Sequence, residues 1–423
     1  MAASGPRPLE GVKVLDLSRV LAGPWCTQIL ADFGADVIKI ESPGTGDDTR
    51  AWGPPNLPKA EGEPGNGESA YYLCCNRNKR SLAINIADKA GADIIRKLAA
   101  EAHVVVENFK LGGLKKYGLD FESLKKINPK LVYCSITGFG QSGPYASRPG
   151  YDFVVQAMGG FMSITGDPAG PPTRAGVAIA DVATGLYAAV SVLVALRHAE
   201  RTGVGQQIDL ALLDTQMTVL ANQSLTYLVD GTVPGRLGNA HPTIVPYRVF
   251  EAADGPFVIA VGNDGQFKLL CDVLGAPDLA ADPRFTRNVD RVRYREILEP
   301  TIEALTRKHP RDPLMAELTK GGVPCGPVNT IAQAFQDPFA QHRKTVHHFT
   351  RDDGVDVPTV TFPGKLSETP AENLREPPRL GEHTFDALKD WLTISAGELQ
   401  ALQAAGVVMD RDTMLANLRK TGT

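Results

Sequence analysis

The sequence predicts an α/β protein in which a large domain built on a parallel sheet is joined to a smaller α+β domain. Three observations support this prediction. The first third alternates β-branched runs with helix-like segments, which is typical of βαβ units. The pattern changes after the turn-rich residues 229–242. The length of 423 residues also exceeds what one simple hydrophobic core usually holds.

The alternation begins near the N-terminus. Residues 12–18 (VKVLDLS) predict a strand. Residues 24–33 predict a helix, because Pro24 suits a first turn and Gly34 follows the last one. The same alternation predicts further strands at 36–41, 81–87, 104–107 and 131–137, and a helix at 88–100 that Asp88 opens. Helices between successive strands imply parallel pairing with both faces of the sheet covered.

The remaining elements suggest three segments. Residues 1–231 form the N-terminal part of the large domain, ending with the apolar stretch 176–196, a strand at 207–213 and a helix to about 228. In that stretch a buried strand is expected to pass into a buried helix. Residues 232–325 form the small domain, with a hairpin around ADG and two helices, at 265–274 and 290–308. Residues 326–423 end in helical segments.

Composition excludes several classes of protein. The net charge of −4 gives no overall basic field for nucleic acid or anionic lipid. The longest apolar run, 182–196, is shorter than the roughly 20 residues that a bilayer span needs, so we expect no membrane span. The first residues contain no secretory or organellar presequence, which predicts a cytoplasmic location. Six scattered cysteines without a CxxC pair, and histidines without ligand spacing, predict free thiols and no metal.

Two basic segments suit an anionic ligand. In CCNRNKRSL (74–82) the side chains of Arg77, Lys79 and Arg80 alternate with amides, as phosphate oxygens prefer, although a solvated strand end is the alternative. The segment 109–118 (FKLGGLKKYG) follows a predicted strand at its carboxyl end, where parallel sheets bind ligands. The first βα turn, 18–25, lacks the GxGxxG glycines, which disfavours a dinucleotide cofactor.

One acid stands out within the apolar stretch 176–196. Asp181 could cap the helix that follows, a role worth about 1 kcal/mol. It could instead be a carboxylate nucleophile at a helix N-terminus, with the small residues Ala180, Ala183 and Gly185 leaving room for a substrate. The two roles are compatible, and the residues alone leave both open.

Taken together, several motifs resemble the class III CoA-transferases, a family that includes formyl-CoA:oxalate, carnitine and bile-acid CoA-transferases and the α-methylacyl-CoA racemases. The resemblance rests on motifs in a fixed order that cover nearly the whole chain. The segments GTGDDTRAWGPP and ADVATGLYA look closest to the succinyl-CoA:glutarate subgroup. The motifs include LAGPWCTQILADFGADVIKIESPGTGDDTR, NRNKRSL, VVVENF, YCSITGFGQSGPY, RPGYDF, GVAIADVATGLYA, GNAHPTIVPY and LGEHT.

The resemblance implies a Rossmann-like sheet built from both ends of the chain, a small domain from the middle, and an interlocked homodimer. It implies coenzyme A and acyl-CoA as substrates, with no tightly bound cofactor. It places the nucleophile on Asp181. CoA contacts are implied on or near Val20, Asn76, Arg77, Lys79, Arg80, Asn108, Phe109 and Lys116. Arg50 and Tyr151 are candidates for holding the carboxylate of the acid, since a guanidinium binds one bidentately.

Chemistry separates a transferase from a racemase. Racemisation at the α-carbon needs two proton-transfer groups, and the racemases pair their acid with the histidine of a GHD motif. The matching stretch here is GYD, and Tyr151, with a reference pKa of about 10, is a poor base near neutral pH. We therefore predict transfer of CoA, most simply from succinyl-CoA to a small carboxylic acid such as glutarate. A racemase and a non-catalytic acyl-CoA-binding protein are the alternatives.

Overall fold

The computed structural model describes residues 5–59 and 67–421, and the chain divides into two compact units. The large unit comprises residues 1–160, 175–224 and 338–423. The small unit comprises residues 161–174 and 225–337. The sequence-based bounds of the small domain, 232–325, do not include the first of these segments. The Gly-, Pro- and acid-rich sequence of residues 42–67 predicts a long loop, of which residues 60–66 lie outside the described residues.

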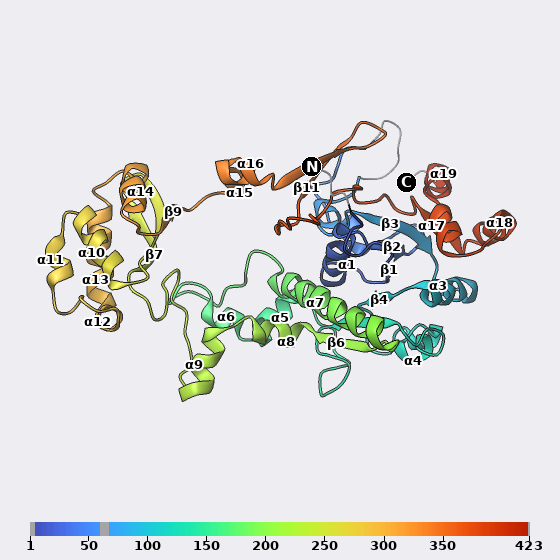
Figure 1. Ribbon diagram of the computed structural model, residues 1–423, viewed down its shortest axis with the longest axis horizontal. Helices are drawn as coiled ribbons and strands as arrows, with labels where there is room; N and C mark the ends of the chain where they lie inside the picture. The colour runs from blue at the N-terminus through green and yellow to red at the C-terminus, as the bar shows by residue number, and fades with distance from the viewer. Residues whose placement is uncertain (1–4, 60–66, 422–423) are drawn as a thin grey trace. The chain divides into compact units, whose positions relative to one another are not determined.

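A seven-stranded sheet forms the centre of the large unit, in the order β12-β3-β2-β1-β4-β5-β6 (Figure 1). Every neighbouring pair is parallel except β12 with β3, so the predicted parallel α/β sheet is confirmed. The antiparallel strand β12 comes from the C-terminal segment. The strands are β1 (Lys13–Asp16), β2 (Asp36–Glu41), β3 (Lys79–Ile84), β4 (Val104–Glu107), β5 (Val132–Thr137), β6 (Gln207–Ala211) and β12 (Val408–Met409).

Alternating side chains on these strands supply two hydrophobic cores, one on each face. Val14 points to one face and the adjacent Leu15 to the other, as the two-residue period of a strand requires. The face of Val14 is covered by α1 (Ala22–Asp32) and α7 (Ile179–Thr202), with α5 (Asp152–Met158) and α8 (Leu212–Thr218). The face of Leu15 is covered by α3 (Lys89–Glu101), α4 (Phe121–Leu124), α17 (Thr384–Trp391) and α18 (Ala396–Ala404).

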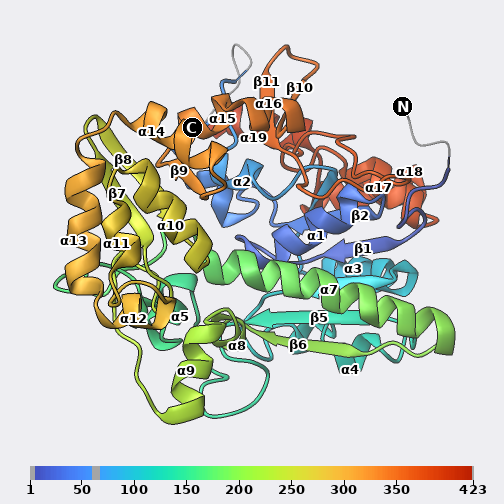
Figure 2. The same cartoon turned by 60° about the vertical axis from the view of Figure 1, so that its left-hand side comes forward.

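The long helix α7, green in Figure 2, packs along α1. A Cβ atom built on Gly185 would lie 2.7 Å from the carbonyl oxygen of Ala22 and 2.9 Å from Cβ of Trp25. Gly185 therefore permits close packing of two helices, and the expectation that this residue leaves room for a substrate is wrong. The expected strand before the helix is also absent, since residues 176–178 form no strand and the helix begins at Ile179.

Only part of α7 is covered within the chain. Its Ala-rich face lies in the core, whereas an apolar row on the other face is exposed: Leu186, Tyr187, Val190, Leu193 and Val194. By length and composition α7 is the one described helix that could cross a membrane, and half of its most apolar window is buried in the protein. Partial burial of this kind is typical of a helix that packs against other protein surfaces.

The small unit has its own sheet and core. Antiparallel strands β7 (Tyr247–Ala252), β8 (Gly255–Ala260) and β9 (Cys325–Pro327) pack against the surrounding helices through a core that includes Phe250, Phe257 and Phe267. The helix predicted at 290–308 is two helices. The helices are α10 (Asp264–Val273), α11 (Pro277–Ala281), α12 (Asn288–Arg293), α13 (Arg295–Thr306), α14 (Arg311–Lys320) and α15 (Ile331–Gln336), with α6 (Phe161–Ile164) from the earlier segment. Helix α9 (Asn222–Asp230) begins in the large unit and ends in the small one.

Short elements complete the large unit. The loop after β2 contains a 3₁₀ turn, η1 (Asp48–Ala51), and leads to α2 (Ala70–Leu73). The C-terminal segment adds a hairpin of β10 and β11 before the helices that cover the sheet. The remaining elements are η2 (Lys115–Tyr117), α16 (Pro338–Arg343), β10 (Val346–Thr350), β11 (Asp356–Val360) and α19 (Arg411–Thr421).

The close packing of α7 on α1 leads to a stability prediction. Gly185→Ala should lower the free energy of unfolding by about 1–3 kcal/mol, because the added methyl group meets main-chain atoms that cannot rotate away. Gly397→Ala in α18 is the matched control, since a Cβ there meets nothing within 4 Å, and it should be neutral or stabilise the protein by up to about 1 kcal/mol. Urea unfolding measures both variants. Equal stability of the two would contradict the packing argument.

Candidate active site

The N-terminus of α7 brings Asp181 to the edge of the sheet where ligands bind in this topology. Helix α7 connects the parallel strands β5 and β6, so its first turn lies at the carboxyl ends of the strands. Asp181 is the third residue of the helix and is partly exposed. The partial positive charge of a helix N-terminus favours an ionised acid at this position.

Asp152, rather than Asp181, accepts a hydrogen bond from a main-chain N–H group in the first turn of α7. The main-chain N–H of Ala180 donates to Oδ1 of Asp152 (2.8 Å), and Nε2 of Gln156 donates to its Oδ2 (2.6 Å). The N-cap residue is Ala178, and no side chain of its own helix caps α7. The capping role considered for Asp181 is therefore wrong. Within residues 5–59 and 67–421, the side-chain carboxylate of Asp181 makes no hydrogen bond or ion pair.

The surroundings of Asp181 raise its pKa to about 7. Burial is the larger cause, because a desolvated carboxylate loses the hydration that stabilises its charge. The nearby negative charge of Asp152 is the second cause. A carboxylate without hydrogen-bond partners and with a raised pKa is more nucleophilic than a solvated one, and strongly shifted acids cluster at functional sites.

Tyr71 of α2 is a further group close to this acid. Its ring makes an edge-to-face contact with Trp52, with centroids 5.2 Å apart. Burial and, secondarily, the negative charge of Asp181 raise the pKa of Tyr71 far above its usual range. The phenol therefore stays protonated and keeps its O–H as a hydrogen-bond donor.

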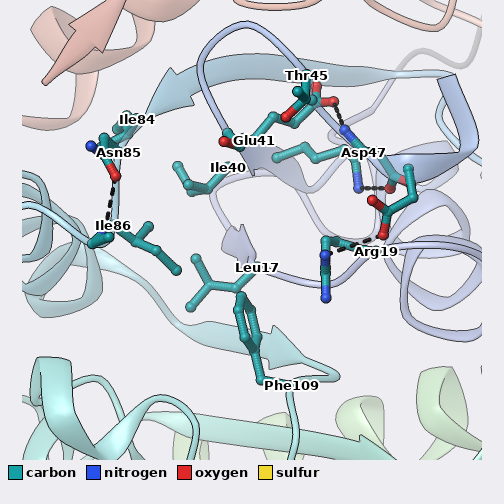
Figure 3. A pocket seen from close by; sticks show the side chains of 15 residues that line it. Leu17, Arg19, Ile40, Glu41, Thr45, Asp47, Ile84, Asn85, Ile86 and Phe109 are labelled. Atoms are coloured by element: carbon teal, nitrogen blue, oxygen red, sulfur yellow. Dashed lines mark hydrogen bonds and ion pairs between the residues drawn. The ribbon is translucent and has the colours of Figure 1, made fainter. Parts of the chain in front are cut away.

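A cavity of about 290 Å³ opens at the carboxyl ends of β1 to β4 (Figure 3). Its walls combine apolar groups, such as Leu17 and Ile86, with charged groups such as Arg19 and Asp48. This position coincides with the switch point between β1 and β4, where ligands bind in doubly wound sheets. The remaining lining residues are 39–42, 45–47, 84, 85, 87 and 109.

Of the predicted CoA contacts, Phe109 lines this cavity, and Val20 and Asn108 contact the lining residues Asp47 and Arg19. The amide of Asn108 bonds to both main-chain groups of Arg19, at 2.9 and 2.7 Å, and the Arg19 guanidinium lies over the ring of Phe109. Val20 has a φ of +71°, a strained conformation for a β-branched residue, and its N–H faces the carboxylate of Asp47 at 3.3 Å. Strain held in place by its surroundings is a frequent mark of functional loops.

The basic segment 76–80 lies mostly inside the protein. Nζ of Lys79 is fully buried and donates to Asp16 (3.1 Å) and to the side-chain oxygen of Asn76 (2.9 Å). Arg77 forms a buried pair with Asp32, and Arg80 pairs with Asp36 and Asp390. In this structure these cations stabilise the sheet and its covering segments, and none of them lines the cavity.

The other predicted contacts are separated from these. Arg50 binds Glu41 bidentately, with both distances 2.7 Å, and also donates to Tyr72. Its guanidinium is therefore engaged by side chains of the protein itself. Lys116 is exposed on η2, over the ring of Tyr117. Tyr151 is 63% exposed at the start of α5.

The sequence analysis does not identify four residues near the site, which are Asp152, Gln156, Tyr71 and Arg19. Asp152 stands next to Tyr151 in the GYD stretch, so the motif was available, but its partner Ala180 is 28 residues away. Nothing local signals such a contact. No group of three or more potential metal ligands occurs in the part of the chain that the structure describes.

Comparisons with known proteins identify the family to which the chain is similar. Residues 9–384 match the model of CoA-transferase family III. The chain is 51% identical over 387 residues to the succinate–glutarate CoA-transferase of Agrobacterium fabrum, covering 92% of this chain and 96% of that one. It is 41% identical to the human succinyl-CoA:glutarate CoA-transferase, covering 96% and 91%. A solved CaiB/BaiF family structure from Brucella suis is similar, with 49% identity and a TM-score of 0.81, covering 92% of this chain and 100% of that one.

The burial of Lys79 distinguishes a structural cation from a ligand contact. Lys79→Met should lower the free energy of unfolding by about 3–5 kcal/mol, because the buried Asp16 loses its directly bonded cation and keeps only the electrostatic effect of Lys39. Lys110→Met, at an exposed position, is the matched control and should change stability little. Urea unfolding measures both. A stable Lys79→Met protein with weakened CoA binding would instead support a direct role in binding CoA.

Proposed function

The chain belongs to CoA-transferase family III, and on that premise we propose that it transfers CoA from succinyl-CoA to glutarate or a similar dicarboxylate, with Asp181 as the nucleophile. The substrates follow the names of the bacterial and human relatives. The observation that carries the assignment to Asp181 is the state of its carboxylate. It is partly buried in the first turn of α7, has no hydrogen-bond partner among the described residues, and has its pKa raised to about 7.

In the first half-reaction the Asp181 carboxylate attacks the thioester carbonyl of succinyl-CoA. The carbon–sulfur bond breaks, CoA leaves as the thiolate, and a mixed succinyl–aspartyl anhydride forms. The thiolate then attacks the aspartyl carbonyl of this anhydride, which releases succinate and leaves an aspartyl–CoA thioester.

The second half-reaction reverses these steps with the acceptor. A carboxylate of glutarate attacks the aspartyl thioester and expels the CoA thiolate, which gives a glutaryl–aspartyl anhydride. The thiolate then attacks the glutaryl carbonyl, so that glutaryl-CoA forms and the Asp181 carboxylate is regenerated. Every bond made or broken belongs to the substrates or to Asp181, so the reaction requires no tightly bound cofactor.

CoA is assigned to the cavity at the carboxyl ends of β1 to β4. Phe109 and Arg19 line it, and the partly exposed Arg19 side chain, which pairs with Asp48 at 3.1 Å, is the cation proposed to meet a phosphate. We further propose that the protonated hydroxyl of Tyr71 donates a hydrogen bond to the substrate.

Substitution of Asp181 tests the nucleophile. Asp181→Ala and Asp181→Asn should each lower kcat for succinyl-CoA:glutarate exchange by about 10³-fold or more, because neither side chain can form the anhydride. The exposed Asp214, in the first turn of α8, provides a matched control, and Asp214→Asn should leave kcat unchanged. Wild-type turnover by Asp181→Asn would refute the assignment.

The pH profile of the same exchange reaction is a second test of Asp181 as the nucleophile. The ionised form of Asp181 is the nucleophile and its pKa is about 7, so kcat/KM should be full above about pH 8. Below pH 7 it should fall about tenfold per pH unit as the acid protonates. An acid limb near pH 4 would mean that Asp181 is not the titrating nucleophile.

We also propose that the protein is a homodimer, as the family resemblance implies. The exposed apolar row on α7 is a surface that a second copy of the chain would cover. Val190 is 59% exposed and Val194 is 65% exposed, one turn apart on the same helix face. A row of this kind is costly to leave in water, and its length matches a helix-packing interface.

Light scattering after size exclusion tests the dimer. The wild-type chain should elute with twice the mass of the 423-residue chain, and Val190→Glu combined with Val194→Glu should shift it toward the monomer, because burying two carboxylates is unfavourable. Val289→Glu, at an exposed position of α12, serves as the control. A monomeric wild-type protein, or a dimer that the double substitution leaves intact, would contradict the proposal.

A further inference from the structure

Asp152 and Gln156 form a buried pair on α5 that holds the chain directly before Asp181. They lie four residues apart, so they share one face of the helix. Nε2 of Gln156 donates to Oδ2 of Asp152 at 2.6 Å. Gln156 is fully buried, and Asp152 is 8% exposed. Each polar atom of this pair that receives or gives these bonds is therefore shielded from water.

The pair bonds to both ends of a short segment. The main-chain N–H of Ala175 donates to Oε1 of Gln156 at 2.9 Å, and that of Ala180 donates to Oδ1 of Asp152 at 2.8 Å. Ala175 is the residue at which the chain returns to the large unit after the segment 161–174. Asp181 follows Ala180 directly. The two bonds thus fix residues 175–180 to α5.

We propose that Asp152 and Gln156 are positioning residues for the transfer reaction: together they clamp residues 175–180 so that the first turn of α7 presents the Asp181 carboxylate without a cap. The proposal rests on Asp181 being the nucleophile, as proposed above. Because Asp152 takes the N–H of Ala180, both oxygens of Asp181 stay available to a thioester. A displacement of about 1 Å in such a nucleophile costs about 10²-fold in rate.

The clamp also has an electrostatic consequence. Among the described residues, the titratable groups coupled electrostatically to Asp181 are Asp152 on α5 and Tyr71 on α2. Tyr71 stays protonated, so Asp152 supplies the negative charge that affects the titration of Asp181. Removing that charge should favour the ionised form of Asp181 and move the acid limb of kcat/KM to lower pH.

A charge-swap experiment separates positioning from folding. In Asp152→Asn the new amide faces the Gln156 amide donor to donor, and in Gln156→Glu two carboxylates face each other. In the double variant Asp152→Asn/Gln156→Glu, the amide of residue 152 can donate to the new carboxylate, and the bonds from Ala175 and Ala180 are both restored. The net charge of the pair remains the same.

Each single variant should lower kcat about tenfold or more while KM for succinyl-CoA changes less than about threefold, since the nucleophile and not the CoA cavity is displaced. The double variant should recover kcat to within about threefold of wild type. Asp152→Asn should also shift the acid limb to lower pH. Circular dichroism at the assay temperature confirms that each variant is folded. Asp120→Asn, which removes a comparable carboxylate on the opposite face of the sheet, should change neither parameter.

Wild-type kcat in both folded single variants would overturn the clamp, as would a double variant no better than the worse single one. An unshifted acid limb in Asp152→Asn would overturn its electrostatic part. These failures differ from failure of the nucleophile assignment. If Asp181→Asn kept its turnover, the proposed function would fail whatever the clamp variants did; if it were inactive while the clamp variants behaved as wild type, the clamp alone would fail.

Discussion

The hydrogen bond from the N–H of Ala180 to the carboxylate of Asp152 determines where α7 begins and what remains free at its first turn. A helix leaves its first N–H groups without partners, and a nearby acid usually accepts from one of them. Here the acceptor is Asp152 of α5, so Asp181 in the first turn of α7 does not have to accept that hydrogen bond. The chemistry proposed for Asp181 depends on its carboxylate being left free in this way.

The contrast with other buried acids shows what is unusual about Asp181. Burial alone would raise the pKa of Asp47, but the ammonium of Lys39, 2.8 Å away, lowers it to about 2. Asp16 is likewise held ionised against burial, by Lys79 and Lys39. Asp181 is desolvated and has a second acid, not a base, beside it. Glu107 also has its pKa raised to about 7 by burial, but it accepts hydrogen bonds from Ser135 and the N–H of Phe109. Among the described residues the Asp181 carboxylate has neither a cation nor a donor, so the protein gives up some stability at this group, as active sites commonly do.

Many strands and helices of the large unit could be predicted from the sequence, because the patterns that indicate them lie within a few neighbouring residues. Runs such as VVVE at 104–107 and a proline at a first turn predict strands and helices from neighbouring residues, and the ordered motifs identified the family correctly. Contacts between distant residues could not be predicted in this way. Lys79 reads as a phosphate-binding cation in NRNKR, yet it pairs with Asp16, 63 residues away, inside the sheet. Gly185 looked like space for a substrate until its neighbours on α1 were known.

The most direct test of the central claim is to find the covalent adduct. Wild-type protein mixed with succinyl-CoA and then with hydroxylamine should yield a hydroxamate, because hydroxylamine attacks the aspartyl thioester and releases CoA. Peptide mass spectrometry should place this modification on Asp181, and leaving out succinyl-CoA should abolish it. A hydroxamate on another acid, or unmodified Asp181 under conditions in which CoA exchange is rapid, would contradict the account.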